Sequence, residues 1–435
     1  MRISVWNDLN ADEKLSTLAR PQALVDESLR QSTADILTAV RRRGDAAIRE
    51  YTKRYDGVDL TDLQVPTKDM KAAWDALPIA DKAAMETAKT NIETFHTAQI
   101  PRVYEVETMP GVLCRREPRP LESAGLYVPG GSAPLVSTLM MLAIPAKIAG
   151  VPKRITITPP GKNGKVNENI LAAGYLCGVT DMYVAGGAQA IAALGYGTQS
   201  IPKCAKIFGP GNAYVAQAKA QISMEMGGPA IDLPAGPSEA MVLADDQASA
   251  IFVAADLLSQ AEHDPMAQVI CVCRSQDFAN TLSGEITRQL KNLPRKNIAK
   301  QALKNGRIII APNTGTMLDI ANIYAPEHLI VQIQNPENVM DKIRNAGSVF
   351  LGPWTPEAVG DYASGTNHTL PTFGAARAYS GVGVESFMKY ITVQMLTRQG
   401  LETLGPCVER LASMEGLEAH RRAVSLRLKM GGTYE

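Results

Sequence analysis

Apolar side chains along the first hundred residues recur at intervals of three and four, which is the spacing of amphipathic helices. One such stripe is formed by Val25, Leu29, Ile36, Leu37 and Val40. Another is formed by Met85, Ala88, Ile92 and Phe95. These patterns predict an N-terminal arm over residues 1–23 and a helical segment over residues 24–119, which we expect to pack on the second of two α/β domains.

From about residue 120, short apolar strands alternate with helices. Strands are predicted at residues 124–128, 154–158, 181–185 and 207–208. A second block of the same kind occupies residues 250–351. This alternation is typical of parallel sheets covered by helices, with ligands at the carboxyl ends of the strands. The predicted fold class is α/β, with two Rossmann-like, incomplete doubly wound parallel-sheet domains over residues 120–236 and 237–380.

After about residue 380 the alternation stops. One amphipathic helix is marked by Leu401, Leu404, Val408 and Leu411, and a second covers residues 417–429. Residues 381–435 have too few apolar side chains for a core of their own, so both helices must bury one face against something else. We therefore expect a helical C-terminal tail that serves dimerisation.

The composition is that of an ordinary globular protein: 435 residues, 45% hydrophobic and 20% charged. Basic and acidic residues each number 44, so the net charge is zero. Nucleic acid or an anionic membrane surface would favour a basic excess, so neither is expected as a partner. Met1–Leu18 lacks the apolar segment of a signal peptide, and no apolar run approaches the roughly 20 residues of a membrane span. The six cysteines show no disulfide spacing, and we expect six buried thiols in a cytoplasmic protein.

Three predicted strands of the first block end in glycine-rich turns. The turns are Pro129–Ser132, Gly186–Gln189 and Gly209–Asn212. At such a position the pyrophosphate of a dinucleotide can meet the amides of a helix N-terminus. None of the three is a G-x-G-x-x-G motif, and a single glycine-rich turn is more often only a tight turn. Three in one sheet make nucleotide binding as strong an interpretation as tight turns alone.

A polar line follows one predicted helix before Pro265. Asp256, Gln260 and His263 are spaced at i, i+4 and i+7. An imidazole and an amide oxygen one turn apart could hold a divalent metal, together with two ligands from elsewhere. A solvated polar face is the commoner origin of an isolated Gln-x-x-His pattern.

Three segments of the second block contain further candidate functional residues. A rigid loop over residues 231–239 presents Ser238, and Glu327 and His328 lead directly into a predicted strand. A long Gly/Ser/Thr-rich loop contains Asp361 and His368. In isolation, the Glu-His pair could simply satisfy backbone groups at a strand edge, and the loop residues could form Asx-turns.

Taken together, five motifs resemble the histidinol dehydrogenase family, the enzymes of the last two steps of histidine biosynthesis. They are Gly209–Lys219, Asp232–Glu239, Leu257–Pro265, Tyr324–Leu329 and Gly360–Pro371. The resemblance covers essentially the whole chain.

The resemblance implies an NAD-linked, four-electron oxidation of L-histidinol to L-histidine through bound L-histidinal, with one zinc ion per subunit. The zinc ligands would be Gln260, His263, Asp361 and His420. Substrate would be contacted by these ligands and by Ser238, His328, His368 and Glu415. NAD would be contacted by Tyr127, Gln189 and Asn212. The family resemblance also implies a homodimer in which the tail carrying Glu415 and His420 completes the partner's site.

The residue types suit this chemistry. His328 is a base for the alcohol proton, and Glu327 is placed to deprotonate the water that hydrates the aldehyde. Three alternatives remain: a related zinc- and NAD-dependent dehydrogenase of another small amino or hydroxy alcohol, a zinc hydrolase, and a non-catalytic scaffold stabilised by zinc.

Overall fold

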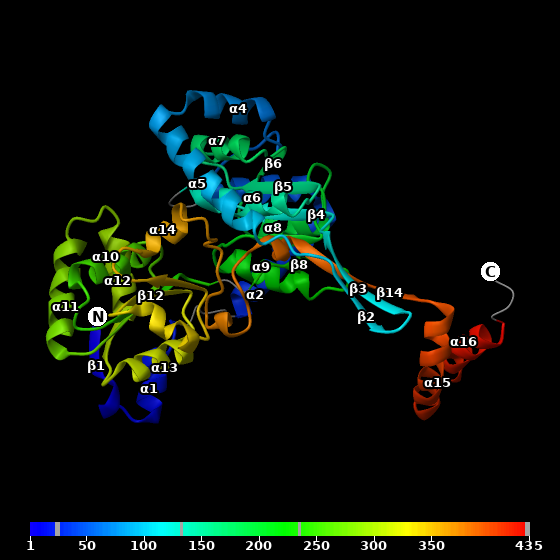
Figure 1. Ribbon diagram of the computed structural model, residues 1–435. Coiled ribbons are helices and arrows are strands. Elements are labelled where there is room, and N and C mark those ends of the chain that lie inside the picture. Colours follow the sequence, from blue (N-terminus) through cyan, green and yellow to red (C-terminus); the bar gives the residue numbers. More distant parts are fainter. Residues whose placement is uncertain (22–26, 131–133, 234–235, 431–435) are drawn as a thin grey trace. The chain divides into compact units, whose positions relative to one another are not determined.

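The computed structural model describes residues 1–21, 27–130, 134–233 and 236–430 (Figure 1). The chain divides into two compact units. The first comprises Met1–Gln99 and Leu121–Phe387, and the second comprises Ile100–Pro120 and Met388–Glu435. Among the described residues, the first unit contains two parallel sheets and the second an antiparallel one.

The first parallel sheet has five strands in the order β6-β5-β4-β7-β8. Their bounds are β4 (Ser123–Tyr127), β5 (Lys153–Thr158), β6 (Asp181–Val184), β7 (Lys206–Phe208) and β8 (Ala230–Ile231). Counted along the chain, this is the order 3-2-1-4-5, which is a doubly wound sheet without its sixth strand. The α/β class predicted for this region is confirmed.

Two layers of helices cover the first sheet. The inner helices are α6 (Val136–Ile148), α7 (Glu168–Leu176), α8 (Gly187–Tyr196) and α9 (Ala213–Ser223). The outer helices are α2 (Glu27–Arg43), α3 (Asp45–Asp56), α4 (Thr67–Ala76) and α5 (Ile79–Thr97). Because α8 is buried from Ala188 to Gly195, its outer side also needs a cover, and the apolar stripe of α2 provides it. The expectation that these N-terminal helices pack on the second α/β domain was therefore wrong.

The second parallel sheet has six strands in the order β1-β11-β10-β9-β12-β13. Their bounds are β1 (Arg2–Val5), β9 (Glu239–Ala244), β10 (Gln268–Cys273), β11 (Arg307–Ile310), β12 (His328–Gln332) and β13 (Ser348–Leu351). The last five repeat the 3-2-1-4-5 order of the first sheet, and β1 of the N-terminal arm is added at the edge. Every residue of β9, β10 and β12 is buried, as expected for a parallel sheet covered on both faces.

The helices of the second sheet supply separate apolar cores on its two faces. They are α10 (Ala250–Ala261), α11 (Gln276–Leu290), α12 (Lys296–Asn305), α13 (Thr314–Tyr324) and the short α14 (Glu357–Tyr362). The arm adds α1 (Ala11–Leu18), and 3-10 turns lie at Trp6–Asp8, Pro336–Lys342, Ala375–Arg377 and Val384–Phe387.

The second unit combines a three-stranded antiparallel sheet with a helical pair. The strands, in the order β14-β3-β2, are β2 (Tyr104–Met109), β3 (Val112–Pro120) and β14 (Met388–Leu396). The guanidinium of Arg116 lies 3.5 Å from the ring centroid of Tyr390 across β3 and β14. The helices α15 (Arg398–Met414) and α16 (Glu418–Lys429) pack on each other and confirm the two helices predicted for the tail. The prediction that residues 100–119 are helical was wrong, and the tail begins with an unpredicted strand.

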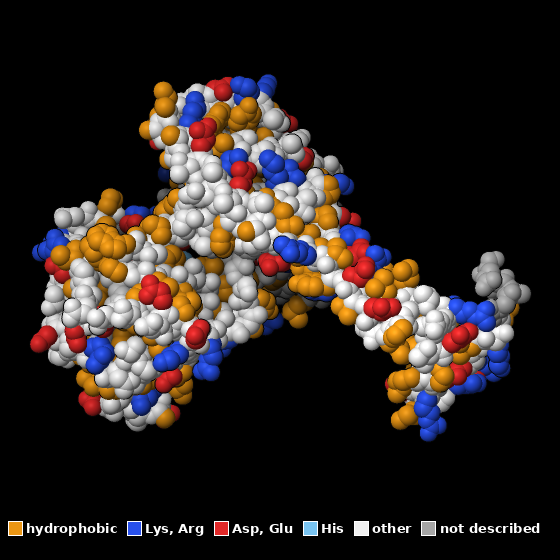
Figure 2. Space-filling view, in the orientation of Figure 1, with side chains coloured by type: hydrophobic (Ala, Val, Ile, Leu, Met, Phe, Trp, Pro, Cys, Tyr) orange, Lys and Arg blue, Asp and Glu red, His pale blue; other side chains and the backbone are white. Residues whose placement is uncertain are grey.

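All six cysteines are free thiols, but only Cys177, Cys204, Cys271 and Cys273 are buried. Cys114 is half-buried and Cys407 is exposed, so the expectation of six buried thiols was wrong. On the face shown in Figure 2, acidic and basic side chains are interspersed, in keeping with the net charge of zero. Within the described ranges, no helix has the length and apolar character that crossing a membrane requires.

Candidate active site

The chemically important side chains gather at the amino ends of two neighbouring strands of the second sheet. Glu239 is the first residue of β9 and His328 the first of β12, and the two strands pair in parallel with His328 opposite Ala240. The helix α13 ends at Ala325 in the left-handed conformation, and the chain then turns directly into β12. The prediction that ligands lie at the carboxyl ends of the strands therefore does not describe this cluster, which lies at their amino ends.

One peptide unit of β9 holds both members of the Glu-His pair. The main-chain N–H of Glu239 donates to Oε2 of Glu327 at 2.8 Å, and Nδ1 of His328 lies 3.1 Å from the carbonyl oxygen of Glu239. A carbonyl can only accept, so Nδ1 carries the proton, and Nε2 is left to act as a base. Glu327 and His328 are both buried.

Glu239 is itself fixed by the N-terminal arm. Arg20 donates from Nε to Oε1 of Glu239 at 2.5 Å and from its Nη2 atom to Oε2 at 2.9 Å. The same guanidinium donates to the carbonyl of Tyr324 at 2.8 Å and lies 4.0 Å from the ring centroid of that tyrosine. The arm therefore anchors the strand end that holds the Glu-His pair.

Three carboxylates surround the imidazole of His328. Its Nε2 lies 3.4 Å from Oδ1 of Asp361 and 3.8 Å from Oε1 of Glu357, and its Nδ1 lies 3.6 Å from Oε2 of Glu327. Burial disfavours the imidazolium, but the carboxylates outweigh burial and raise the pKa of His328 to about 10. A bound cation would offset this accumulation of negative charge, and the imidazole could then release the proton from Nε2, as a base at this position requires.

Burial raises the pKa of each carboxyl group in the cluster, and the imidazole of His328 lowers it. Burial raises the pKa of Glu327 to about 8 and that of Glu357 to about 7. Burial would also raise the pKa of Asp361, but the facing imidazole of His328 outweighs it and lowers that pKa below the usual range. Asp361 is therefore the most acidic carboxyl of the group.

The predicted metal ligands of the first unit lie around this imidazole. Gln260 is at the end of α10 and its Nε2 donates to Oε1 of Glu357, which lies one turn before Asp361 on α14. His263 follows α10. Desolvation lowers the pKa of its imidazole, and the nearby Asp361 carboxylate opposes that shift. The structure thus brings Gln260, His263 and Asp361 to one place, although α10 and α14 are nearly a hundred residues apart.

Three buried acceptor atoms in this cluster have no hydrogen-bond partner among the described residues. They are Oε1 of Gln260, Oδ1 of Asp361 and Nε2 of His328. His328, Glu357 and Asp361 each offer a ligand atom within 4.8 Å of the others. Buried polar atoms are rarely left unpaired, and an amide oxygen, a carboxylate and imidazoles suit zinc. The residues present therefore fit a divalent cation.

His368 bridges the cluster to the first sheet. Its Nδ1 lies 2.9 Å from the carbonyl oxygen of Asp361, and its Nε2 lies 2.9 Å from Oγ1 of Thr138 on α6. The neighbouring Asn367 donates to the carbonyl of Met141 on the same helix. Ser238 is half-buried beside Glu239, and its carbonyl oxygen accepts from the N–H of Gln268 at 3.1 Å. Both predicted substrate contacts thus border the cluster.

The three predicted NAD contacts lie at the carboxyl ends of the first sheet. The hydroxyl of Tyr127, at the end of β4, accepts from the N–H of Gly187 at 3.2 Å, which draws together β4 and the start of α8, where Gln189 lies. Burial raises the pKa of Tyr127 to about 12. Asn212 is the N-cap of α9, since its Oδ1 accepts from the N–H of Val215 at 3.1 Å.

The turn before Asn212 requires glycine. Gly209 has a φ of +116°, and a Cβ there would lie 2.0 Å from the carbonyl oxygen of Tyr127. Its N–H donates to Oδ2 of Asp232 at 2.7 Å, and Lys219 pairs with the other oxygen of that carboxylate. Part of the first predicted glycine turn (131–133), and residues 234–235 of the loop before Ser238, lie outside the described residues.

Glu415 and His420 belong to the second unit. Glu415 is the C-cap of α15, His420 is on α16, and both are exposed. Neither is part of the cluster that the first unit forms by itself.

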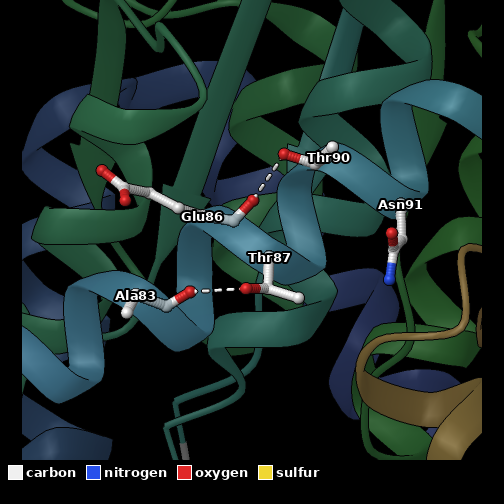
Figure 3. A pocket seen from close by; sticks show the side chains of 5 residues that line it. All are labelled: Ala83, Glu86, Thr87, Thr90 and Asn91. Atoms are coloured by element: carbon white, nitrogen blue, oxygen red, sulfur yellow. Dashed lines mark hydrogen bonds between the residues drawn. The ribbon is translucent and has the colours of Figure 1, made fainter.

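A separate hollow lies on α5, lined by Ala83, Glu86, Thr87, Thr90 and Asn91 (Figure 3). The hydroxyls of Thr87 and Thr90 donate to carbonyls one turn earlier, so they are used within the helix. Asn91 donates to the carbonyl of Ala363, two residues after Asp361, and so supports the end of α14. The hollow has a structural role and is not the candidate site.

Comparison with known proteins identifies the family. The model of the histidinol dehydrogenase family matches residues 19–428. The chain is 48% identical over 429 residues to histidinol dehydrogenase from Vibrio parahaemolyticus, covering 99% of each chain. It is 49% identical over 423 residues to that of Escherichia coli K12, covering 97% of this chain and 96% of the relative. The crystal structure of histidinol dehydrogenase from Elizabethkingia anophelis superposes with a TM-score of 0.95 at 45% identity, covering 100% of this chain and 99% of that one.

The chain belongs to the histidinol dehydrogenase family.

The resemblance read from five sequence motifs is thus confirmed, and as a histidinol dehydrogenase family member the chain is an oxidoreductase. Three residues of the cluster were not singled out from sequence: Glu357, Glu239 and Thr138. Glu357 had a weak signal, because it precedes Asp361 by one helical turn. Glu239 acts mainly through its peptide group, and Thr138 through a contact between distant elements, so no pattern of side chains marks either.

Proposed function

We propose that this chain oxidises L-histidinol to L-histidine through bound L-histidinal, with transfer of two hydrides to NAD and one zinc ion per subunit. The observation that carries the proposal is the Nε2 atom of the buried His328, which lies 3.4 Å from the unpartnered Oδ1 of Asp361. The amide of Gln260, whose Oε1 is also without a partner among the described residues, is bound to Glu357 of the same cluster. A base and two oxygens suited to a metal therefore belong to one cluster. The names of the family relatives give the substrate class.

Gln260, His263 and Asp361 would hold the zinc, with His420 as the fourth ligand. When bound, the metal orients the imidazole and amino nitrogens of the substrate. Ser238, His368 and Glu415 would contact the rest of the substrate.

The proton chemistry belongs to two residues. In the first oxidation, His328 takes the proton of the alcohol at Nε2 as hydride leaves the carbon, which yields the aldehyde. Glu327 then takes a proton from the water that adds to the aldehyde carbon, and His328 returns its proton to the carbonyl oxygen, which gives the hydrate. In the second oxidation, His328 takes a hydroxyl proton of the hydrate as the second hydride leaves, which yields the carboxylic acid, and the acid then loses its proton to become the carboxylate.

The domain roles follow from this chemistry. Residues 120–236 would bind NAD at the carboxyl edge of the first sheet, through Tyr127, Gln189 and Asn212 and the N-termini of α8 and α9. Residues 237–380 would hold the zinc and the catalytic pair. The tail over residues 381–435 would dimerise the protein and place Glu415 and His420 in the site of a second copy. The six free thiols suit a reducing cytoplasm.

The test is incubation of the purified protein with L-histidinol and NAD, with NADH counted by absorbance and the product identified by mass. Two NADH per alcohol and histidine as product are expected. One NADH with accumulated aldehyde, or turnover of other small amino alcohols in preference to histidinol, would overturn the assignment. Product formation without NADH would favour the zinc hydrolase.

Chelation separates a substrate-positioning metal from a structural one. Removal of zinc should abolish activity while circular dichroism and the thermal midpoint show a retained fold, and added zinc should restore activity. Unfolding on chelation would instead favour the zinc-stabilised scaffold.

A further inference from the structure

To bind a metal, the side-chain amide of Gln260 must direct its oxygen atom, and not its NH₂ group, toward the ion. An amide presents an oxygen on one side and an NH₂ group on the other, and a half-turn about the last side-chain bond exchanges them. Only the oxygen can ligate a cation. A glutamine ligand therefore needs something that sets the orientation of its amide, whereas a carboxylate does not.

Glu357 supplies this constraint. Its Oε1 accepts from Nε2 of Gln260, and its Oε2 accepts from the hydroxyl of Ser259 at 2.7 Å. Glu357 is 1% exposed. Two consecutive residues of α10 therefore hold the two oxygens of a buried carboxylate. If the amide turned over, its oxygen would face the Glu357 carboxylate, and two acceptors would be in contact without a proton between them.

The other end of the amide is left for a ligand. Oε1 of Gln260 is buried and has no hydrogen-bond partner among the described residues. The same α14 that carries Glu357 carries the proposed ligand Asp361 one turn later, so one short helix would both provide a ligand and orient another. Asn91 of α5 donates to the carbonyl of Ala363 and fixes the far end of this helix.

We propose that Glu357 is a positioning residue, which directs the amide oxygen of Gln260 toward the metal and so raises the affinity for zinc. This inference rests on the zinc site of the proposed function. Removal of hydrogen-bond partners that orient metal ligands typically weakens metal binding about 10- to 100-fold.

The test is a double-mutant cycle with the zinc dissociation constant, measured by competition with a chromogenic chelator, as its readout. Its variants are Glu357→Leu, which has no acceptor for the Gln260 amide, Gln260→Ala and the two combined, with Glu337→Leu as a matched control at an exposed position. We expect Glu357→Leu to weaken zinc binding about 10- to 100-fold. In the Gln260→Ala background, the same substitution should have no further effect, because the group that it orients is absent. The control should bind zinc as the wild type does.

Additive effects of the two substitutions would overturn the proposal, because they would make Glu357 an independent zinc ligand. Zinc affinity unchanged in Glu357→Leu would overturn it as well. Glu357→Asp provides a second variant that keeps the charge but withdraws the carboxylate from Gln260. It should lose affinity similarly, and wild-type affinity in it would count against the proposal. NAD affinity and the thermal midpoint verify that each variant is folded. Absence of zinc from the wild type would instead contradict the proposed function itself.

Discussion

The Nδ1 atom of His328 lies 3.1 Å from the main-chain carbonyl oxygen of Glu239. This contact fixes the tautomer of the imidazole, and the N–H of the same residue binds the carboxylate of Glu327. The two side chains proposed as catalytic thus share one backbone anchor but have separate functional atoms. Their roles can therefore be separated by mutation without loss of the anchor.

We predict that His328→Ala and Glu327→Gln fail differently. His328→Ala would lose the proposed proton acceptor of both oxidations, so turnover of histidinol and of histidinal should each fall by about 10²- to 10⁴-fold. Glutamine at position 327 can still accept from the N–H of Glu239, but it cannot take a proton from water. Assays with each substrate separately should therefore show a larger loss for histidinal. An equal loss of the alcohol step in Glu327→Gln would contradict this division of roles.

A second prediction concerns the buried pair of Arg20 and Glu239. Arg20→Met leaves the Glu239 carboxylate, 3% exposed, without its cation, so the free energy of unfolding should fall by about 3 kcal/mol. Arg20→Met combined with Glu239→Gln should recover much of this loss, since no buried charge is then unpaired. Denaturant titration measures both. Arg288→Met, at an exposed ion pair, is the matched control and should be far milder. A fully additive double variant would show that the pair is not coupled.

Sequence patterns predicted those parts of the fold in which burial alone decides the structure. Strands such as β9 and β10 are buried at every residue and form plain apolar runs between helices. By contrast, five of the six residues of β2 are exposed, so this strand has no apolar alternation to reveal it. The apolar stripe of α2 likewise showed that one face is buried, but a stripe does not specify which domain covers it.

The candidate site divides in the same way. Gln260 and His263 lie close together in sequence, and Glu327 and His328 are adjacent, so local motifs were sufficient to find them. Glu357 acts through a contact between α10 and α14, which are linked only by the tertiary fold. Residues that orient other residues leave little trace in a single sequence.

The third prediction separates the cofactor site from the metal site. Gln189→Ala should weaken NAD binding and leave zinc content unchanged, because Gln189 lies on α8 of the first α/β domain and the proposed ligands lie on other elements. Asn212→Ser should do the same while preserving stability, since serine can replace asparagine as the N-cap of α9. Titration calorimetry and metal analysis measure the two quantities. Loss of zinc in either variant would argue against separate subsites.

The fourth prediction is a pH dependence at Asp256, which accepts from Nε2 of Gln332 at 2.9 Å. Burial raises its pKa from 3.8 to about 6. Its protonated form is therefore favoured in the folded state, and the associated stability is present below pH 4 and is lost as the pH rises through about 6. Asparagine does not ionise, so Asp256→Asn does not lose stability as the pH rises through this range.

In zinc-free protein, the stability of Asp256→Asn relative to wild type should accordingly increase between pH 4 and 6, by about 2 kcal/mol, and then level off. Denaturant titration at each pH measures the difference. The increase should persist in 1 M salt, because its cause is burial and not surface charge. A difference that is constant with pH would show that Asp256 is not destabilised when ionised.

The fifth prediction is that the tail completes the site of a second copy. Apolar side chains flank Glu415 on the tail surface: Leu411, Met414 and Leu417 are 54%, 71% and 43% exposed. Their exposure is costly unless another surface covers them. The cluster of the first unit has three proposed zinc ligands and needs a fourth, which His420 would supply. A two-fold dimer with crossed tails satisfies both requirements.

Mixing two inactive variants tests this arrangement. Gln260→Ala damages the cluster and His420→Ala damages the tail, and the two are unfolded and refolded together. If tails act between subunits, each mixed dimer has one doubly damaged site and one intact site. Random pairing makes about half of the dimers mixed, so activity should return to roughly a quarter of wild type. Each variant refolded alone is the control and should stay inactive. If each tail served its own subunit, every site would carry a lesion, and the mixture would remain inactive as well.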